Sequence, residues 1–217
     1  MSQGFRPFFL LAGIWAPLSM ALFIAMFQGF IALPTAFDTV AWHYHEMLFG
    51  YVAAVLAGFA LTAIPNWTGR LPLQGPPLLV LVLFWLAGRV AVAGSAIIGV
   101  GAAAAIDLLF LAGLAAVILR EIVAGRNWRN LPLVVAVILF FLCNGLLHSE
   151  TLGLIDSDGR VQKLSIAVPV LLITLIGGRI IPSFSRNWLA KRDAMRLPAS
   201  FGRFDRLTLG ATLVALT

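Results

Sequence analysis

The sequence predicts an all-α protein, a polytopic transmembrane helical bundle with six complete spans and a truncated seventh. Composition is the first support for this fold class: hydrophobic residues make up 61% of the 217 residues and charged residues only 11%. Soluble domains carry about 25% charged residues. The mean hydropathy of +0.99 is the second support. Because so few polar side chains cannot cover a water-facing surface, we expect most of the surface to contact lipid.

Long apolar segments are the third support, since a span needs about 20 mostly apolar residues. We expect Pro65 and Pro182 to end the second and the sixth of them, because proline disfavours helix on its N-terminal side. A last apolar segment starts near Leu207 and reaches Thr217 at half the needed length, so we expect one transmembrane domain over 1–217 that has been cut short. The six complete spans are expected at 8–33, 43–64, 78–96, 97–119, 131–148 and 164–182.

The distribution of lysine and arginine predicts the orientation, since cytoplasmic loops carry an excess of both. With the N-terminus inside, the outer loops hold only Arg160 and Lys163. The net charge of +6 then follows from membrane topology, so we expect membrane lipids and no nucleic acid as the anionic partner. The inner segments hold eleven basic residues: Arg6, Arg70, Arg120, Arg126, Arg129, Arg186, Lys191, Arg192, Arg196, Arg203 and Arg206.

The stretch WHYHEMLFGY, which begins at Trp42, places titratable groups at the mouth of a membrane helix, where they are expensive. The predicted topology brings all three histidines, His43, His45 and His148, to the outer end of the bundle. Imidazole and thioether groups suit copper and haem iron, so these histidines are candidate metal ligands and Met47 is a candidate soft ligand. The alternative is that the histidines are interfacial residues in contact with headgroups and water.

A regular helix would place His43, Glu46, Met47 and Gly50 on one side and His45 nearly opposite. His43 and His45 therefore cannot both bind one ion unless the first turn is unwound. Glu46 is placed to orient an imidazole by accepting a hydrogen bond from its second ring nitrogen. No motif of a soluble enzyme is present, so the sequence makes no prediction about catalysis.

Two charged residues, Arg89 and Asp107, lie near the middle of the third and fourth spans, which a short connection joins into a hairpin. We expect them to form an ion pair, because an isolated charge costs a few kcal/mol or more in a membrane. The alternative function is a transporter or channel-like protein with a polar path through Glu46, Arg89 and Asp107. Small residues recur every fourth position along the second span, for example Gly50 and Gly58, and predict close helix packing.

Four sequence blocks resemble the NnrS family of bacterial cytoplasmic-membrane proteins. They are GFRPFF from Gly4, WHYHEMLFGY from Trp42, TAIPNWTG from Thr62 and GGRIIP from Gly177. The resemblance implies an association with haem, copper and the response to nitric oxide and nitrosative stress, in a chain of about twelve spans in the inner membrane. It favours His43, His45 and His148 as metal ligands, with Met47 and Glu46 beside the cofactor.

This resemblance also bears on length and partners. The sequence is similar to the N-terminal half of such a chain, so the missing C-terminal half or a partner subunit is expected to bind it. The expected function is that of a haem- and copper-associated protein that protects against nitric oxide, with its metal centre near the periplasmic face.

Overall fold

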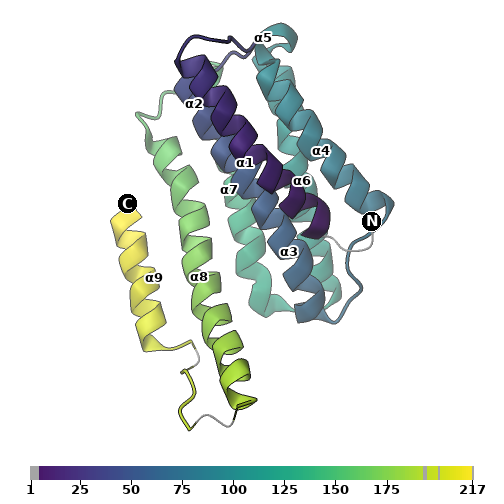
Figure 1. Ribbon diagram of the computed structural model, residues 1–217, viewed down its shortest axis with the longest axis vertical. Coiled ribbons are helices and arrows are strands. Elements are labelled where there is room, and N and C mark those ends of the chain that lie inside the picture. Colours follow the sequence, from purple (N-terminus) through teal and green to yellow (C-terminus); the bar gives the residue numbers. More distant parts are fainter. Residues whose placement is uncertain (1–4, 193–194, 200, 217) are drawn as a thin grey trace. The chain divides into compact units, whose positions relative to one another are not determined.

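The computed structural model describes residues 5–192, 195–199 and 201–216, and every regular element among them is a helix (Figure 1). Gly4 and Thr217, which the sequence motifs and the last predicted span include, lie outside the described residues. The chain forms two compact units, Met1–Val161 and Gln162–Thr217, and each is described by itself. A single domain over 1–217 stays a prediction.

The helices follow the predicted order of spans. The second span combines an α-helix, a π-helix and a second α-helix without a break, and short elements α5 and η2 lie in two of the connections. The elements are α1 (Phe5–Phe27), α2 (Thr39–His45), η1 (Glu46–Val52), α3 (Ala53–Thr68), α4 (Pro76–Ala93), α5 (Ser95–Ile98), α6 (Val100–Ala124), η2 (Trp128–Asn130), α7 (Leu131–Thr151), α8 (Arg160–Ala190) and α9 (Arg203–Leu216).

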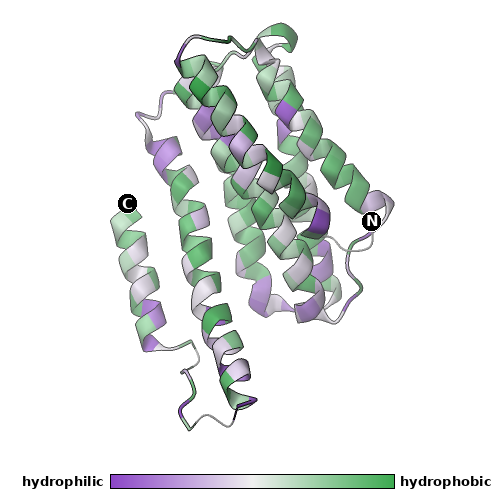
Figure 2. Cartoon of the chain, viewed as in Figure 1, coloured by the Kyte–Doolittle hydropathy of each residue, from purple (hydrophilic) through white to green (hydrophobic). Residues whose placement is uncertain are grey.

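Six of these helical stretches are long and apolar enough to cross a membrane, which confirms the predicted number of complete spans. Figure 2 shows hydrophobic residues along most of their length and hydrophilic residues mainly at their ends and connections. The boundaries differ from those predicted, because α3 continues past Pro65 and α8 past Pro182. A proline removes one backbone donor, and the helix can continue with a bend where packing holds it.

In the first unit, α1 runs antiparallel to the second span. Phe23, near the end of α1, stacks on His43 with ring centroids 4.0 Å apart. Towards the start of α1, Phe9 lies against Gly58, where an added Cβ would come within 2.9 Å of the Phe9 ring. The small residues of the second span therefore let α1 approach closely, as their spacing predicted.

A π-helix interrupts the second span at Glu46–Val52. A π-turn holds more residues than an α-turn, so it rotates the side chains around it relative to a regular helix. The indole nitrogen Nε1 of Trp85, on α4, donates a hydrogen bond of 2.9 Å to the Gly50 carbonyl within this segment. The π-helix lies where the titratable residues of the second span enter the bundle.

The predicted hairpin of α4 and α6 is present, with the one-turn helix α5 in its connection. The two helices approach closely at Gly88, where an added Cβ would lie 2.6 Å from Asp107 Oδ1 and 3.2 Å from Asp107 Cα. Helix α7 then runs back along α6, and Leu108 lies 4.0 Å from the position of a Cβ on Gly145. As a result α2 begins, α4 ends, α6 begins and α7 ends at one end of this unit.

The second unit holds most of α8 and all of α9. Helix α9 begins at Arg203, whereas the sequence predicted that the seventh segment starts near Leu207. The Gly202 amide donates a hydrogen bond of 2.7 Å to Asp205 Oδ2 at the start of α9. The guanidinium of Arg179 lies 5.6 Å from the ring centroid of Phe201. These contacts join α8, the connection and α9 within the unit.

The close approach at Gly88 gives a test of the hairpin. We expect Gly88→Ala to lower the unfolding free energy by about 1–3 kcal/mol, because the new methyl meets the Asp107 carboxylate, which the ion pair with Arg89 holds in place, and the backbone of α6 behind it. Gly101→Ala on the same hairpin is the matched control, since nothing lies within 4 Å of its added Cβ. The measurement is thermal unfolding of both variants in one detergent, and equal melting temperatures would contradict the account.

Candidate metal centre

A buried cluster of ionisable side chains lies near the end of the first unit where α2 begins. His45 and Glu46 from the second span are both 0% exposed, and Arg89 on α4 is 4% exposed. Asp107 on α6 and His148 on α7 are 2% and 1% exposed. Arg89 and Asp107 are therefore nearer this end than the span middles where they were expected: Asp107 follows the start of α6 at Val100 by seven residues.

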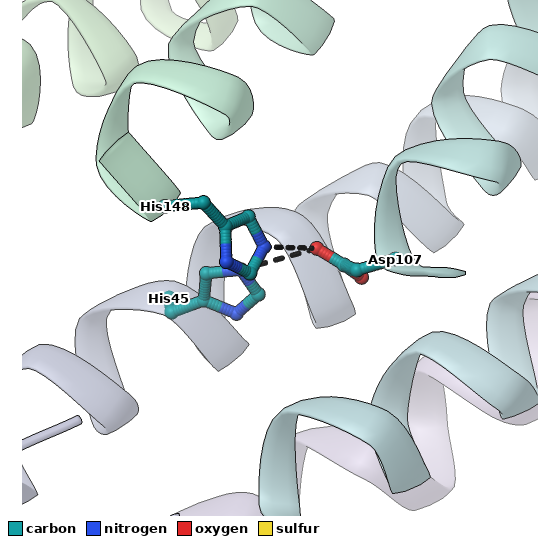
Figure 3. A group of neighbouring side chains, drawn as sticks. All are labelled: His45, Asp107 and His148. Carbon is teal, nitrogen blue, oxygen red and sulfur yellow. Dashed lines mark hydrogen bonds and ion pairs between the residues drawn. The ribbon is translucent and has the colours of Figure 1, made fainter. Parts of the chain in front are cut away.

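Three metal-ligating groups meet at the centre of the cluster (Figure 3). Asp107 Oδ2 lies 3.2 Å from His45 Nε2 and 3.1 Å from His148 Nε2. One ligand atom from each of these residues lies within 4.8 Å of the other two. Two imidazole nitrogens and one carboxylate oxygen this close together could hold a metal ion.

The side chains around this triad hold its rings in place. His45 Nδ1 lies 3.2 Å from Glu46 Oε1, and His45 Nε2 lies 3.0 Å from Asn144 Oδ1. Asn144 Nδ2 donates a hydrogen bond of 2.8 Å to Asp107 Oδ2. Since carboxylates and the amide oxygen are acceptors, His45 serves as the donor in both contacts. Its ring orientation is therefore fixed from two sides, as in metal sites where a second partner orients the histidine.

Arg89 joins the two carboxylates of the cluster. Its Nη1 atom lies 2.7 Å from Glu46 Oε2, and Nη2 forms an ion pair with Asp107 Oδ1. Trp15 on α1 donates a further hydrogen bond of 2.9 Å to Glu46 Oε2. The Asp107 carboxylate thus uses one oxygen for the arginine and leaves the other facing the two histidines, and the predicted Arg89–Asp107 ion pair is present.

Gly50 provides the space in which this arginine lies. A Cβ at Gly50 would come within 2.6 Å of Trp15 Nε1, 2.7 Å of Glu46 Oε2 and 2.9 Å of Arg89 Nη1. All three atoms belong to hydrogen-bonded groups that cannot move aside without losing a partner. A larger residue at position 50 is therefore incompatible with the contacts around Glu46.

Aromatic rings cover the triad. Phe37 lies 5.3 Å from His45 and 5.6 Å from His148 between ring centroids, and Phe49 lies 5.3 Å from His45. The two imidazoles lie 5.2 Å apart at 67°. His148 Nδ1 is buried and has no hydrogen-bond partner among the described residues. The apolar cover limits the access of water, which strengthens the electrostatic interactions inside.

The structure separates the sequence-predicted candidates. His45, His148 and Glu46 lie together in the cluster, whereas the ring of His43 stacks on Phe23 of α1 and is partly exposed. Met47 is also only partly buried. The prediction that His43 and Glu46 share a side opposite His45 is wrong, since Glu46 and His45 contact each other. His45 and Glu46 are neighbours in sequence, so their side chains can contact each other, and the π-helix that begins at Glu46 ends the regular α-helical spacing on which the prediction rested.

Sequence reasoning missed that the predicted ion pair and the histidines form one site. It treated Arg89 and Asp107 as a structural pair and did not consider Asp107 as a metal ligand. A signal was present, because both residues lie within ten positions of the turn that joins α4 and α6. The predicted topology places this turn and the three histidines at the same end of the bundle, so the distances of Arg89 and Asp107 from the turn indicate a depth close to that of the histidines.

Six membrane-length helical stretches and a buried His–Asp–His group define a multi-pass membrane protein with a candidate metal site. The family model described as NnrS protein matches residues 1–217. The chain therefore belongs to the NnrS family, which confirms the resemblance seen in its sequence motifs. Searches among curated proteins and among solved structures gave no match.

The ion pairs that Arg89 forms with Glu46 and Asp107 can be tested by measuring the stability of variants. We expect Arg89→Gln to lower the unfolding free energy by about 3–5 kcal/mol, because it leaves two buried carboxylates without their cation. Adding Glu46→Gln to this variant removes one of those charges, so the double variant should recover part of the loss. The measurement is chemical unfolding of the single and double variants, and a double variant that loses stability additively would contradict these ion pairs.

Proposed function

We propose that this chain is a copper-binding inner-membrane protein that protects against nitric oxide, with the ion held by His45, Asp107 and His148. The observation that carries the proposal is the convergence of three ligand atoms from three spans within 4.8 Å. Membership of the NnrS family supports it, because the family resemblance implies copper and the response to nitric oxide. The excess of arginine at the other end of the unit supports a position of the centre near the periplasmic face.

The donor set fits copper. Two imidazoles and one carboxylate suit copper, zinc or iron more than magnesium or calcium, which prefer oxygen ligands alone. The Nδ1 atom of His148 also supports the proposal, because it is buried and has no hydrogen-bond partner among the described residues. The ring can therefore carry its proton on Nδ1 when Nε2 binds the ion. Copper lies near the top of the affinity order for such sites, so it is the divalent metal favoured by the ligands.

The same residues do not fit a haem. Phe37, Phe49 and the His148 ring pack around the His45 ring at 5.2–5.3 Å between ring centroids. A macrocycle much wider than an imidazole has no room on that ring. His148 lies under the same cover, with the Phe37 and His45 rings 5.6 Å and 5.2 Å from its own. Outside the cluster, the buried Nδ1 of His43 lacks the partner that normally orients a ligating histidine. Haem binding by this chain therefore stays a prediction of the family resemblance.

The residues of the cluster have separable tasks in this proposal. His45 Nε2, His148 Nε2 and Asp107 Oδ2 bind the ion, while Glu46 orients His45 through Nδ1. Arg89 holds Asp107 Oδ1, so that the carboxylate presents a single oxygen. Because the histidines must give up a proton from Nε2 to bind, copper uptake releases protons. A copper ion held there supplies one-electron chemistry for a diatomic ligand such as nitric oxide.

The alternative of a polar transport path has less support from the geometry. Glu46, Arg89 and Asp107 are joined to one another in a closed set of ion pairs at one depth of the bundle. A path across the membrane needs polar groups at successive depths. These three residues are better explained as the support of the metal ligands.

Metal analysis of the full-length membrane protein tests the proposal. We expect copper to copurify with the wild-type protein or to bind on reconstitution, and His45→Ala or His148→Ala to lose it, since each removes one of three ligands. His43→Ala is the matched control, because it removes an imidazole from the same bundle end but outside the cluster. The measurement is copper per protein after chelator washing.

Survival of bacteria under nitric oxide gives the functional readout with the same variants. The His45 and His148 variants should become sensitive, while the His43 variant should protect like the wild type. Wild-type protein that binds no copper, or equal copper in the His43 and His148 variants, would contradict the proposal.

A further inference from the structure

An open cavity lies at the end of the first unit opposite the metal cluster, between the α3–α4 connection and the end of α6. It has a volume of about 590 Å³. None of its lining residues takes part in the proposed copper site, so its chemistry is unexplained by that function. It is lined by Gly69, Arg70, Leu71, Pro72, Leu73, Gln74, Arg120 and Glu121.

The lining carries two cations and one anion. Arg70 Nε bonds Glu121 Oε2 at 2.5 Å, and Arg120 Nε lies 3.9 Å from Glu121 Oε1. The Arg70 side chain is 39% exposed and that of Arg120 71% exposed. Glu121 engages Arg70 through Nε and so leaves both terminal nitrogens of its guanidinium available. The lining therefore has a net charge of +1, and its two arginine side chains can bind an anion.

The cavity lies at the level where the spans end. Helix α3 ends at Thr68, and Gly69 continues in the left-handed conformation with φ of 69°. Asn127, after α6, donates a hydrogen bond to the Trp67 carbonyl and joins the two helix ends. Helix ends of membrane length lie at the headgroup region of a bilayer. Leu71 in the cavity wall is 85% exposed, which places an apolar side chain beside the arginines at the membrane surface.

We propose that this cavity binds the headgroup of an anionic phospholipid with one phosphodiester charge, such as phosphatidylglycerol. A phosphodiester carries one negative charge and matches the net +1 of the lining. Arginine binds phosphate oxygens through two parallel N–H groups, and basic pockets at the cytoplasmic ends of spans bind such headgroups. The exposed Leu71 contacts the acyl chains below the phosphate.

The experiment measures lipid retained by the full chain. Wild-type protein is placed in nanodiscs that contain phosphatidylglycerol and phosphatidylcholine, released, and the bound lipid is counted by native mass spectrometry. We expect preferential retention of phosphatidylglycerol, and a loss of about fivefold in Arg120→Gln, because one arginine contact to an anionic lipid is removed. Arg120 is highly exposed, so its removal leaves the buried structure intact.

Arg129→Gln is the matched control, since it removes one exposed charge at the same bundle end but outside the cavity. It should retain phosphatidylglycerol like the wild type. Equal retention in the Arg120 and Arg129 variants would overturn the proposal. So would wild-type protein without preference for phosphatidylglycerol, or binding of inorganic phosphate alone in phosphatidylcholine membranes, which would indicate a soluble anion. Copper content is measured in parallel, so failure here is distinct from failure of the metal site.

Discussion

The ion pairs of Arg89 are the interaction on which the buried cluster depends. Glu46 and Asp107 come from different spans, and neither carboxylate could stay ionised in a membrane interior without a cation. One guanidinium bonds an oxygen of each, and the planar fork of its nitrogens lets it do so from a fixed position. The remaining oxygens then face the histidines, so the geometry of the metal ligands follows from that of the arginine.

Two glycines and a π-helix make this arrangement possible. Gly88 lets α4 approach α6 beside Asp107, and Gly50 leaves room for the arginine near Glu46. The π-helix at Glu46–Val52 departs from α-helical spacing directly after His45, so the side chains before and after it are rotated relative to those of an unbroken α-helix. The geometry of the centre therefore depends on backbone features beside the ligands as well as on the ligands themselves.

The sequence was sufficient to predict the fold class, the six spans and the Arg89–Asp107 pair, because hydropathy and the cost of buried charge are local properties. It also placed His45 and His148 at one end of the bundle, through the topology alone. The π-helix changes the rotation of His45 relative to the rest of its span, and the sequence had no recognised signal for it. The role of Asp107 as a third ligand beside the two histidines depends on how three helices pack together. It therefore could not be predicted from residue spacing along one helix.

X-ray absorption of the copper-loaded full-length protein tests the central claim most directly, because it reports the atoms bound to the metal. We expect a shell of nitrogen and oxygen atoms with the scattering pattern of two imidazoles, reduced to one imidazole in a His148→Ala variant. A shell that contains sulfur, from Met47 or Cys143, or one that is unchanged in that variant, would contradict a centre built on His45, Asp107 and His148.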